Sequence, residues 1–557
     1  MKKNWKYVLL LGTLCLTACM EKPDVPANGP TAVPTQETVA PEVTETTCAT
    51  TAPEVTTVPE GTESPDTTTV PEVPKATTAP EAVAETVPVR ILLENKRIVE
   101  WEDERQLYAV IWQNPLMGGE DAAKYPAVST VFRSLKTLRD KKSEEVVTNL
   151  ANTAEELKQY ADETDVSCYD STGYFVQRAD NHIISMQCNW NVNTGSIHPS
   201  NVVTGENFST ETGAMISLSE VVTDVEKIRA LVKQTLSEKY ADCLFEEWES
   251  LYDETETDNL AWTMDYDGLT FYFSPYELSF YAAGVLTAEI DFAEEPALFR
   301  DIYMTAPEQG WASAVPFHSF MELDGVNGTK DTFLIGLSKA EWDDFYHKLE
   351  IGKNGRNILE YEMYAYEYKT YLATVADKYY LFVEETTEND YKILYIFDLS
   401  LDCITEPMVQ INAGFVTMRT DAEDYSYGEE VFNNPAEIYL SSRLDVFRTM
   451  SGTRRYSFDA KAGMLVPLTN LYTLDETQTP LVSKIPLEVS VLGENTSTIV
   501  PAGTEFTFLR SDGATYVEFR LPDGRECRVT REDGDGWPYT VNGVPEEECF
   551  DGIGYAG

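Results

Sequence analysis

The fold class is decided by three runs of sequence in the second half of the chain. They are Tyr371-Leu372-Ala373-Thr374-Val375, Tyr379-Tyr380-Leu381-Phe382-Val383 and Tyr391-Lys392-Ile393-Leu394-Tyr395-Ile396-Phe397. Aromatic and β-branched residues dominate them, and short segments with Asp and Asn separate them, which predicts strands joined in hairpins. Aromatic residues make up 11% of the chain, and many lie in runs of this kind. We therefore expect a protein rich in strands.

Three other segments have the spacing of amphipathic helices. The first runs from Val128 to Lys142, the second from about Ser143 to Tyr160, and the third from about Asp224 to Tyr240. The residues expected to face the core of the first and third helices are Val128, Val131, Phe132, Leu135, Leu138, Ile228, Leu231, Val232 and Leu236. Helices in the first half and strands toward the C-terminus predict the α+β fold class.

The folded region is longer than one hydrophobic core usually organises, so we expect about three domains. We place an α+β domain pair at residues 89–300, a strand-rich middle region at residues 301–485 and a small β-barrel at residues 486–557. The barrel is predicted from short strands around the turn Pro522-Asp523-Gly524-Arg525. It resembles the Src-homology-3-like barrels of bacteria, which often contact the cell wall or other domains.

The N-terminus has the pattern of a lipoprotein signal peptide. Lys2, Lys3 and Lys6 are followed by an apolar run that ends in Leu16-Thr17-Ala18-Cys19. This run is too short to span a bilayer, which takes about 20 apolar residues. We predict a signal peptide at residues 1–18, acylation of the Cys19 thiol by membrane lipid, and a lipid-anchored protein on the extracellular face of the cell membrane.

The segment that follows, residues 19–88, is predicted to be a disordered stalk. Residues 20–88 contain no aromatic residue and are built from Thr, Pro, Glu, Val and Ala, with Pro-Glu-Val repeated at 41–43, 53–55 and 71–73. Such a composition buries too little apolar surface to offset the entropy of ordering the chain. Its prolines favour extended geometry, so the segment should act as a spacer.

The chain is strongly acidic, with 94 acidic and 42 basic residues and a formal net charge of −52. Residues 20–88 carry only 12 acidic residues, so most of the negative charge belongs to the folded region. Nucleic acid is excluded as a partner, because binding phosphate requires clustered Lys and Arg. The charge favours cationic proteins, peptides or metal ions as partners. The alternative is that acidity only keeps an exposed lipoprotein soluble.

Residues 89–300 contain an ordered series of short motifs. Tyr125-Pro126 comes first, and Gly195-Ser196-Ile197-His198-Pro199, Asn207-Phe208 and Thr212-Gly213-Ala214-Met215-Ile216-Ser217-Leu218 follow. The series ends with Phe271-Tyr272-Phe273-Ser274-Pro275-Tyr276-Glu277-Leu278 and Tyr281-Ala282-Ala283-Gly284. This order resembles the paired extracellular domains of RsiV-type anti-sigma factors, which also precede PdaC-type peptidoglycan deacetylase modules. The last two motifs are the most specific part of the resemblance.

The resemblance implies a binding module. In RsiV-type proteins this ectodomain binds lysozyme, a strongly cationic protein, and binding triggers release of a sigma factor. Such a protein also needs a transmembrane helix and a cytoplasmic segment, and a PdaC-type enzyme needs a metal-binding deacetylase module; we expect none of these here. The four histidines include no His-x-x-His or His-x-x-x-His pair. We therefore expect no metal and no other cofactor.

Five residues are the candidates for ligand binding: Pro275, Tyr276, Glu277, Tyr281 and His198. An aromatic ring beside a carboxylate on an irregular segment can hold an Arg or Lys through cation–π and charge contacts. The alternative is that Pro275 only ends a strand while the tyrosines cap the core. For His198, in a turn between two strands, the alternative is a side chain satisfied by the backbone.

The remaining sequence patterns give weaker indications of a binding or catalytic site. The acidic run from Phe245 to Asp258 suits calcium or a basic protein but lacks the spacing of a calcium-binding loop, and the alternative is a solvated helix end. The sequence has no Gly-x-Ser-x-Gly, phosphate-loop or Ser-x-x-Lys motif. We therefore predict no catalytic residue and no enzyme.

Six cysteines lie in the folded region: Cys168, Cys188, Cys243, Cys403, Cys527 and Cys549. An exported protein permits disulfides. Cys168 with Cys188 and Cys527 with Cys549 are the possible pairs, and buried free thiols are the alternative.

Together these predictions describe a surface lipoprotein that binds and does not catalyse. The first hypothesis is that residues 89–300 bind a cationic protein such as lysozyme, as a decoy or as a sensor ectodomain. The second is an envelope organiser attached to peptidoglycan through residues 486–557. The third and least favoured is a hydrolase that acts on wall glycans.

Overall fold

The computed structural model describes residues 85–102, 105–158, 168–196, 198–315, 320–324, 330–339, 345–388, 391–419, 427–494, 496–532 and 538–556. All of them belong to one compact unit, Gly61–Gly557. The predicted signal peptide, Cys19 and the stalk up to residue 84 lie outside the described residues and stay predictions. The described chain makes contacts from Glu85 onward: the Glu85 carbonyl accepts a hydrogen bond from the Asn181 side chain at 3.1 Å, and the Thr86 hydroxyl lies 2.5 Å from that of Thr305. No helix in this part of the chain is long and apolar enough to cross a membrane.

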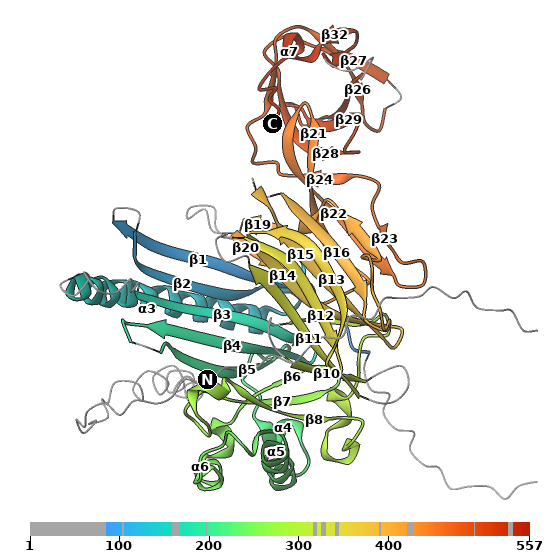
Figure 1. Cartoon of the computed structure of the whole chain (residues 1–557). Coiled ribbons are helices and arrows are strands. Elements are labelled where there is room, and N and C mark those ends of the chain that lie inside the picture. Colours follow the sequence, from blue (N-terminus) through green and yellow to red (C-terminus); the bar gives the residue numbers. More distant parts are fainter. Residues whose placement is uncertain are drawn as a thin grey trace, which may run out of the picture. The chain divides into compact units, whose positions relative to one another are not determined.

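The first part of the fold is a seven-stranded sheet in the order β19-β20-β1-β2-β3-β4-β5. Its strands are β1 (Ile91–Glu102), β2 (Arg105–Met117), β3 (Cys168–Ala179), β4 (Ile183–Asn193), β5 (Ser200–Ser209), β19 (Thr417–Arg419) and β20 (Tyr427–Glu430). Among these described strands, only β2 and β3 pair in parallel. The connection between them carries the short helix α2 (Asp121–Lys124) and the long helix α3 (Pro126–Lys158). Figure 1 shows α3 along one face of β1–β5.

Helix α3 corrects the prediction of two separate helices at residues 128–142 and 143–160, because it is continuous over 33 residues. No Gly or Pro lies at the predicted junction between residues 142 and 143. Asp140, close to this junction, is fixed by contacts with neighbouring side chains. Its carboxylate accepts hydrogen bonds from the Trp112 indole at 2.8 Å and from Asn114 at 2.9 Å, and it pairs with Lys136 at 2.8 Å. Val128 and Phe132 are buried as predicted, whereas Leu138 is 47% exposed.

The second part combines helices with a small antiparallel sheet. Helix α5 (Val225–Tyr240) confirms the third predicted helix; Asp224 caps it by accepting a hydrogen bond from the Lys227 backbone N–H at 3.0 Å. The other elements are α4 (Leu218–Val221), α6 (Trp248–Glu254), β6 (Ala261–Met264), β7 (Gly268–Phe273) and β8 (Leu286–Asp291), with the strands in the order β6-β7-β8. Ile228, Val232 and Leu236 of α5 are completely buried in the core that these elements share.

The middle region contains two sheets that share a core. One has the order β10-β11-β12-β13 and the other β17-β16-β15-β14-β9. The strands are β9 (Trp311–Ala314), β10 (Phe320–Asp324), β11 (Lys330–Lys339), β12 (Tyr346–Lys353), β13 (Arg356–Ala365), β14 (Glu367–Val375), β15 (Lys378–Thr386), β16 (Lys392–Asp398) and β17 (Val409–Ile411). The three runs that decided the fold class are β14, β15 and β16, paired antiparallel as neighbours. The hairpin prediction is confirmed.

The C-terminal strands continue a large sheet in the order β18-β21-β22-β24-β28-β29-β30-β26-β27. The strands of this order are β18 (Gly414–Phe415), β21 (Ile438–Val446), β22 (Arg448–Asp459), β24 (Tyr472–Leu474), β26 (Leu487–Val491), β27 (Thr496–Val500), β28 (Glu505–Ser511), β29 (Tyr516–Arg520) and β30 (Glu526–Thr530). The other elements of this region are β23 (Met464–Pro467), β25 (Leu481–Ser483), β31 (Thr540–Val541), β32 (Val544–Pro545), α7 (Glu546–Cys549) and β33 (Phe550–Asp551). Val446 and Phe447 share a core with Phe506 and Phe519. This core therefore reaches beyond residues 486–557, and a Src-homology-3-like barrel there stays a prediction.

Strand pairing also crosses the predicted boundary at residue 300. Strand β20 pairs with β1, with Leu92 opposite Glu430. Arg90, just before β1, binds the Glu430 carboxylate with two hydrogen bonds of 2.8 Å and lies 3.7 Å from the centre of the Tyr439 ring. The fold is α+β and strand-rich as predicted, but its sheets join segments that lie far apart in the sequence.

Candidate functional site

The structure brings the predicted ligand-binding residues together at one place. His198 lies in the turn between β4 and β5, whereas Pro275, Tyr276 and Glu277 follow β7, and Tyr281 begins the short helix Tyr281–Ala283 before β8. The His198 and Tyr281 rings stack with centroids 4.6 Å apart, and the Tyr276 ring lies 5.6 Å from Tyr281. The structure thus joins two motifs that the sequence only places in the same region.

The backbone around Tyr276 is tightly built and strained. Pro275 follows the end of β7, and the Ser274 N–H donates to the Glu277 carboxylate at 2.8 Å. The Ser274 hydroxyl accepts a hydrogen bond from the Val203 N–H at 3.1 Å, which ties this turn to β5. Tyr276 itself has a φ of 71°, a left-handed conformation that costs a bulky residue about 1–3 kcal/mol. Strain of this kind is often found at functional sites.

Two further aromatic rings extend the site. Phe280 is 59% exposed, and its ring meets that of Phe245 edge-on at 4.9 Å. The contact is held by a hydrogen bond of 3.0 Å from the Phe245 N–H to the Leu278 carbonyl. We call the five rings together the tyrosine patch: His198, Phe245, Tyr276, Phe280 and Tyr281. Sequence reasoning missed Phe280, although it stands next to Tyr281, and treated Phe245 only as part of the acidic run.

Carboxylates lie within and beside the tyrosine patch. Desolvation raises the pKa of Glu277, although the hydrogen bond from Ser274 opposes this shift. Glu246 and Glu247 are exposed and directly follow Phe245. Exposed rings with neighbouring carboxylates can hold Lys or Arg side chains by cation–π and charge contacts. The arrangement suits recognition of a cation.

Part of the acidic run is neutralised by the chain itself. The Lys233 ammonium lies 3.0 Å from Glu249 and 2.9 Å from Asp253, both on α6. Within the described ranges, no three His, Cys, Asp or Glu side chains are grouped so as to hold a metal ion.

Comparison with known proteins identifies one segment of this region. Residues 219–293 match the family described as "Protein of unknown function (DUF3298)". Residues 219–293 form a DUF3298 domain. It supplies four of the five rings of the tyrosine patch, from Phe245 to Tyr281, while His198 comes from the strand connection that precedes it in the chain. No curated protein matches the chain.

Two solved structures of DUF3298 proteins are similar to this chain. The protein from Bacteroides fragilis is 19% identical, with 38% of this chain and 94% of that chain covered and a TM-score of 0.28. The protein from Pseudomonas aeruginosa is 11% identical, with 39% and 98% covered and a TM-score of 0.28.

Neither of the two possible disulfides is formed in the structure: Cys168, Cys188, Cys527 and Cys549 are buried free thiols, the alternative that the sequence left open. Cys188 lies opposite Tyr174 of β3. Tyr174 is six residues from Cys168, and a strand rises about 3.3 Å per residue, so the two cysteines are far outside disulfide range.

Cys527 and Cys549, the second possible pair, lie on two different elements of the C-terminal core. Cys527 lies on β30 opposite Phe519, whereas the Cys549 thiol points to the Val541 and Val544 carbonyls at 3.9 and 3.7 Å. Burial raises the pKa of Cys527 to about 12 and that of Cys549 to about 11. Such thiols are protonated and unreactive at neutral pH.

Proposed function

We propose that the protein binds a cationic protein through the tyrosine patch. The observation that carries this proposal is the exposure of Tyr276 and Phe280, at 60% and 59%. Glu277 follows Tyr276 on its strained turn, and Glu246 follows Phe245, the ring that contacts Phe280. Aromatic rings of this size are usually buried, and a cluster left exposed beside carboxylates supports a binding role. The Lys and Arg side chains of a partner would lie over the rings and meet the carboxylates.

The charge of the whole chain supports the same partner. A formal net charge of −52 attracts a cationic protein from a distance and raises the encounter rate at low salt. Lysozyme is the candidate, because the motifs of residues 89–300 resemble the lysozyme-binding ectodomain of RsiV-type proteins. Anchored by Cys19 on the outside of the membrane, the protein would act as a decoy or as a sensor ectodomain.

The test is a titration of lysozyme into the purified full chain at physiological and at high salt. An unrelated cationic protein of the same charge as lysozyme is titrated separately as a control. Stoichiometric binding of lysozyme that survives high salt supports a shaped interface. Tyr276→Ala should weaken it at least about tenfold, which corresponds to 1.4 kcal/mol.

The matched control is Tyr391→Ala, which removes another exposed tyrosine, outside the patch, and should leave lysozyme affinity unchanged. Binding that disappears with salt, that equals binding of the unrelated protein, or that Tyr276→Ala leaves intact would contradict the proposal.

A further inference from the structure

A second cluster of exposed rings lies at one end of the β12–β13 hairpin. The Phe345 ring contacts Tyr364 at 3.9 Å, His347 at 4.3 Å and Tyr366 at 5.8 Å between centroids. Tyr364 and Tyr366 are 42% and 39% exposed. The sequence predicts only strands here. Nothing in the strand pattern separates these rings from core aromatics such as Phe397.

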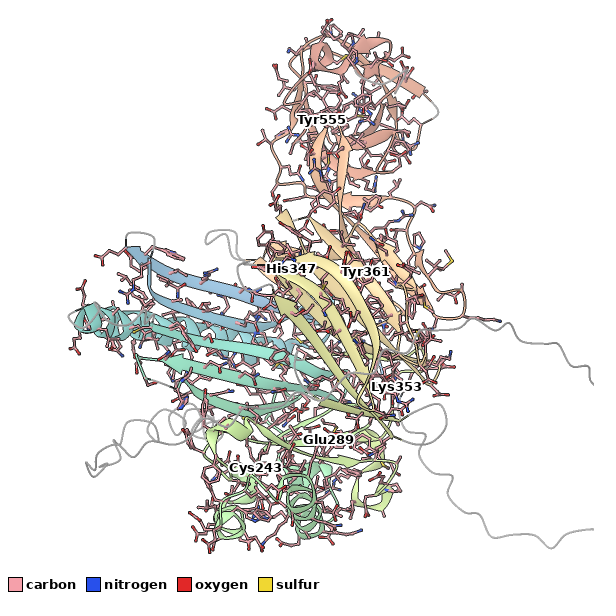
Figure 2. The ribbon with its side chains drawn as sticks, viewed as in Figure 1. Cys243, Glu289, His347, Lys353, Tyr361 and Tyr555 are labelled. Carbon is pink, nitrogen blue, oxygen red and sulfur yellow. The ribbon has the colours of Figure 1, made fainter. Side chains whose placement is uncertain are left out.

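Two β-bulges lie in the backbone next to this cluster. The pairing of β12 with β11 shifts register between Ser338 and Lys339, and its pairing with β13 shifts register at His347. Two bulges thus meet at one position of a single strand, the one occupied by His347, which is labelled in Figure 2. Bulges redirect side chains and are common beside binding sites.

A cavity of about 780 Å³ opens at these bulges, within the range of small-ligand sites. Its lining includes Tyr364, Ser338 and charged residues of both signs, Lys339, Lys348 and Glu362. Glu385, which also lines the cavity, is buried, and its carboxyl group accepts hydrogen bonds from the Tyr395 hydroxyl at 3.0 Å and the Tyr364 N–H at 3.3 Å. Hydrogen-bond donors and acceptors therefore surround an aromatic platform.

We propose that this cavity binds a pyranose ring of an uncharged glycan, stacked on Tyr364. A pyranose ring has an apolar face of C–H groups, which packs against an aromatic ring, and hydroxyl groups that both donate and accept hydrogen bonds. The charges of the lining balance, with Lys339 and Lys348 against Glu362 and Glu385, and Lys348 also lies 2.9 Å from Glu350 and opposite Glu362. A neutral polyhydroxyl ligand can satisfy such a lining, whereas a charged ligand would meet a group of its own sign. This site shares no residue with the tyrosine patch and does not depend on it.

The test is isothermal titration calorimetry, in which the purified full chain is titrated with two soluble probes, the tetramer of N-acetylglucosamine and cellotetraose. We expect saturable binding of at least one. Tyr364→Ala should weaken it about tenfold or more, and Tyr364→Phe should keep the affinity within about twofold, because the ring remains.

Tyr391→Ala is the matched control, since it removes an exposed tyrosine outside this cavity and should not change glycan affinity. The circular dichroism spectrum and melting temperature of Tyr364→Ala are compared with those of the wild type to verify that it is folded. If the folded wild-type chain binds neither probe, or if folded Tyr364→Ala binds as the wild type does, the inference is overturned.

Discussion

Arg178 and Asp180 form an ion pair in which both side chains are completely buried, with the Arg178 Nε 2.6 Å from the Asp180 Oδ2. The Arg178 guanidinium also donates to the backbone carbonyls of Asp265 at 3.1 Å, Tyr303 at 2.6 Å and Thr305 at 3.2 Å. The Asp180 carboxylate accepts hydrogen bonds from the His182 and Ile183 N–H groups. One pair thus joins the β3–β4 turn to the β6–β7 turn and to the segment after the DUF3298 domain.

Arg178→Met is expected to destabilise the fold by about 3–5 kcal/mol, because it leaves the Asp180 charge and three carbonyl groups buried without their donor. Urea denaturation followed by circular dichroism measures the change. The exposed Arg97 on β1 gives the control, since Arg97→Met should shift stability by less than about 0.5 kcal/mol. Equal effects of the two substitutions would contradict this role of Arg178.

Gly205 shows how closely β5 approaches β6. A Cβ atom at Gly205 would lie 1.8 Å from the Trp262 carbonyl oxygen, whereas one at Gly173 of the same sheet would meet nothing nearer than 3.7 Å. We expect Gly205→Ala to lower stability by about 1–3 kcal/mol or more and Gly173→Ala to change it by less than about 1 kcal/mol. Thermal melts of the two variants decide this, and similar melting temperatures would refute the close packing.

Tyr276 is expected to favour binding at the expense of stability. Asn tolerates a left-handed backbone better than Tyr does, so Tyr276→Asn should keep or raise the melting temperature while weakening lysozyme binding at least about tenfold. The two measurements are made on the same preparation. A variant that loses stability and binding together would show that Tyr276 is only structural.

Glu277 predicts a pH dependence of binding. Desolvation raises its pKa above the usual value, so on acidification this carboxylate takes up a proton at a higher pH than an ordinary glutamate. The neutral form attracts a cation less, so affinity for lysozyme should fall as the pH decreases through this raised pKa. Glu277→Gln should remove that component of the pH profile.

Glu277 affects stability in the opposite direction from binding: its contribution to the stability of the fold falls as the pH rises. Because the pKa is higher in the folded state, the stabilisation is complete below the pKa of the unfolded chain and is lost as the pH rises through the folded pKa. Glu277→Gln should therefore fold at least as stably as the wild type at pH 7. Its pH profiles of affinity and melting temperature are compared with those of the wild type, and superimposable profiles would contradict both expectations.

The continuity of α3 is tested at Lys141, an exposed residue next to Lys142, where the first helix was predicted to end. Lys141→Pro should cost about 3 kcal/mol or more if the helix runs through this position, and Lys141→Ala should be nearly neutral. If a proline at this position were tolerated, two helices would be the better description.

Several features were predictable from the sequence because they depend on neighbouring residues. The strands β14, β15 and β16 follow from β-branched and aromatic runs with short connections, and α5 follows from apolar spacing and the Asp224 cap. The end of the first predicted helix was wrong because a surface segment such as Lys141-Lys142 contributes no apolar residue to the pattern. Only the contacts of Asp140 with β2 show that the helix continues there.

The candidate site was predictable in part. Pro275 and the residues near it were identified from their types, but the chain gives no sign that Phe245 meets Phe280 or that two bulges coincide at His347. Strand register is set by pairing between distant segments. A shift of one residue turns a side chain to the opposite face of its sheet, so exposure cannot be read from an alternating pattern alone.

By itself the sequence determined the α+β class, the hairpins of residues 367–398 and the helix after Asp224, since local propensity and hydrogen bonding between near neighbours decide these. Only the tertiary structure decided that β20 pairs with β1, that Cys168 and Cys188 stay apart, and that His198 stacks on Tyr281. These relations depend on which distant surfaces pack together. That choice is made by the burial of a shared core and the satisfaction of buried polar groups, summed over the whole chain.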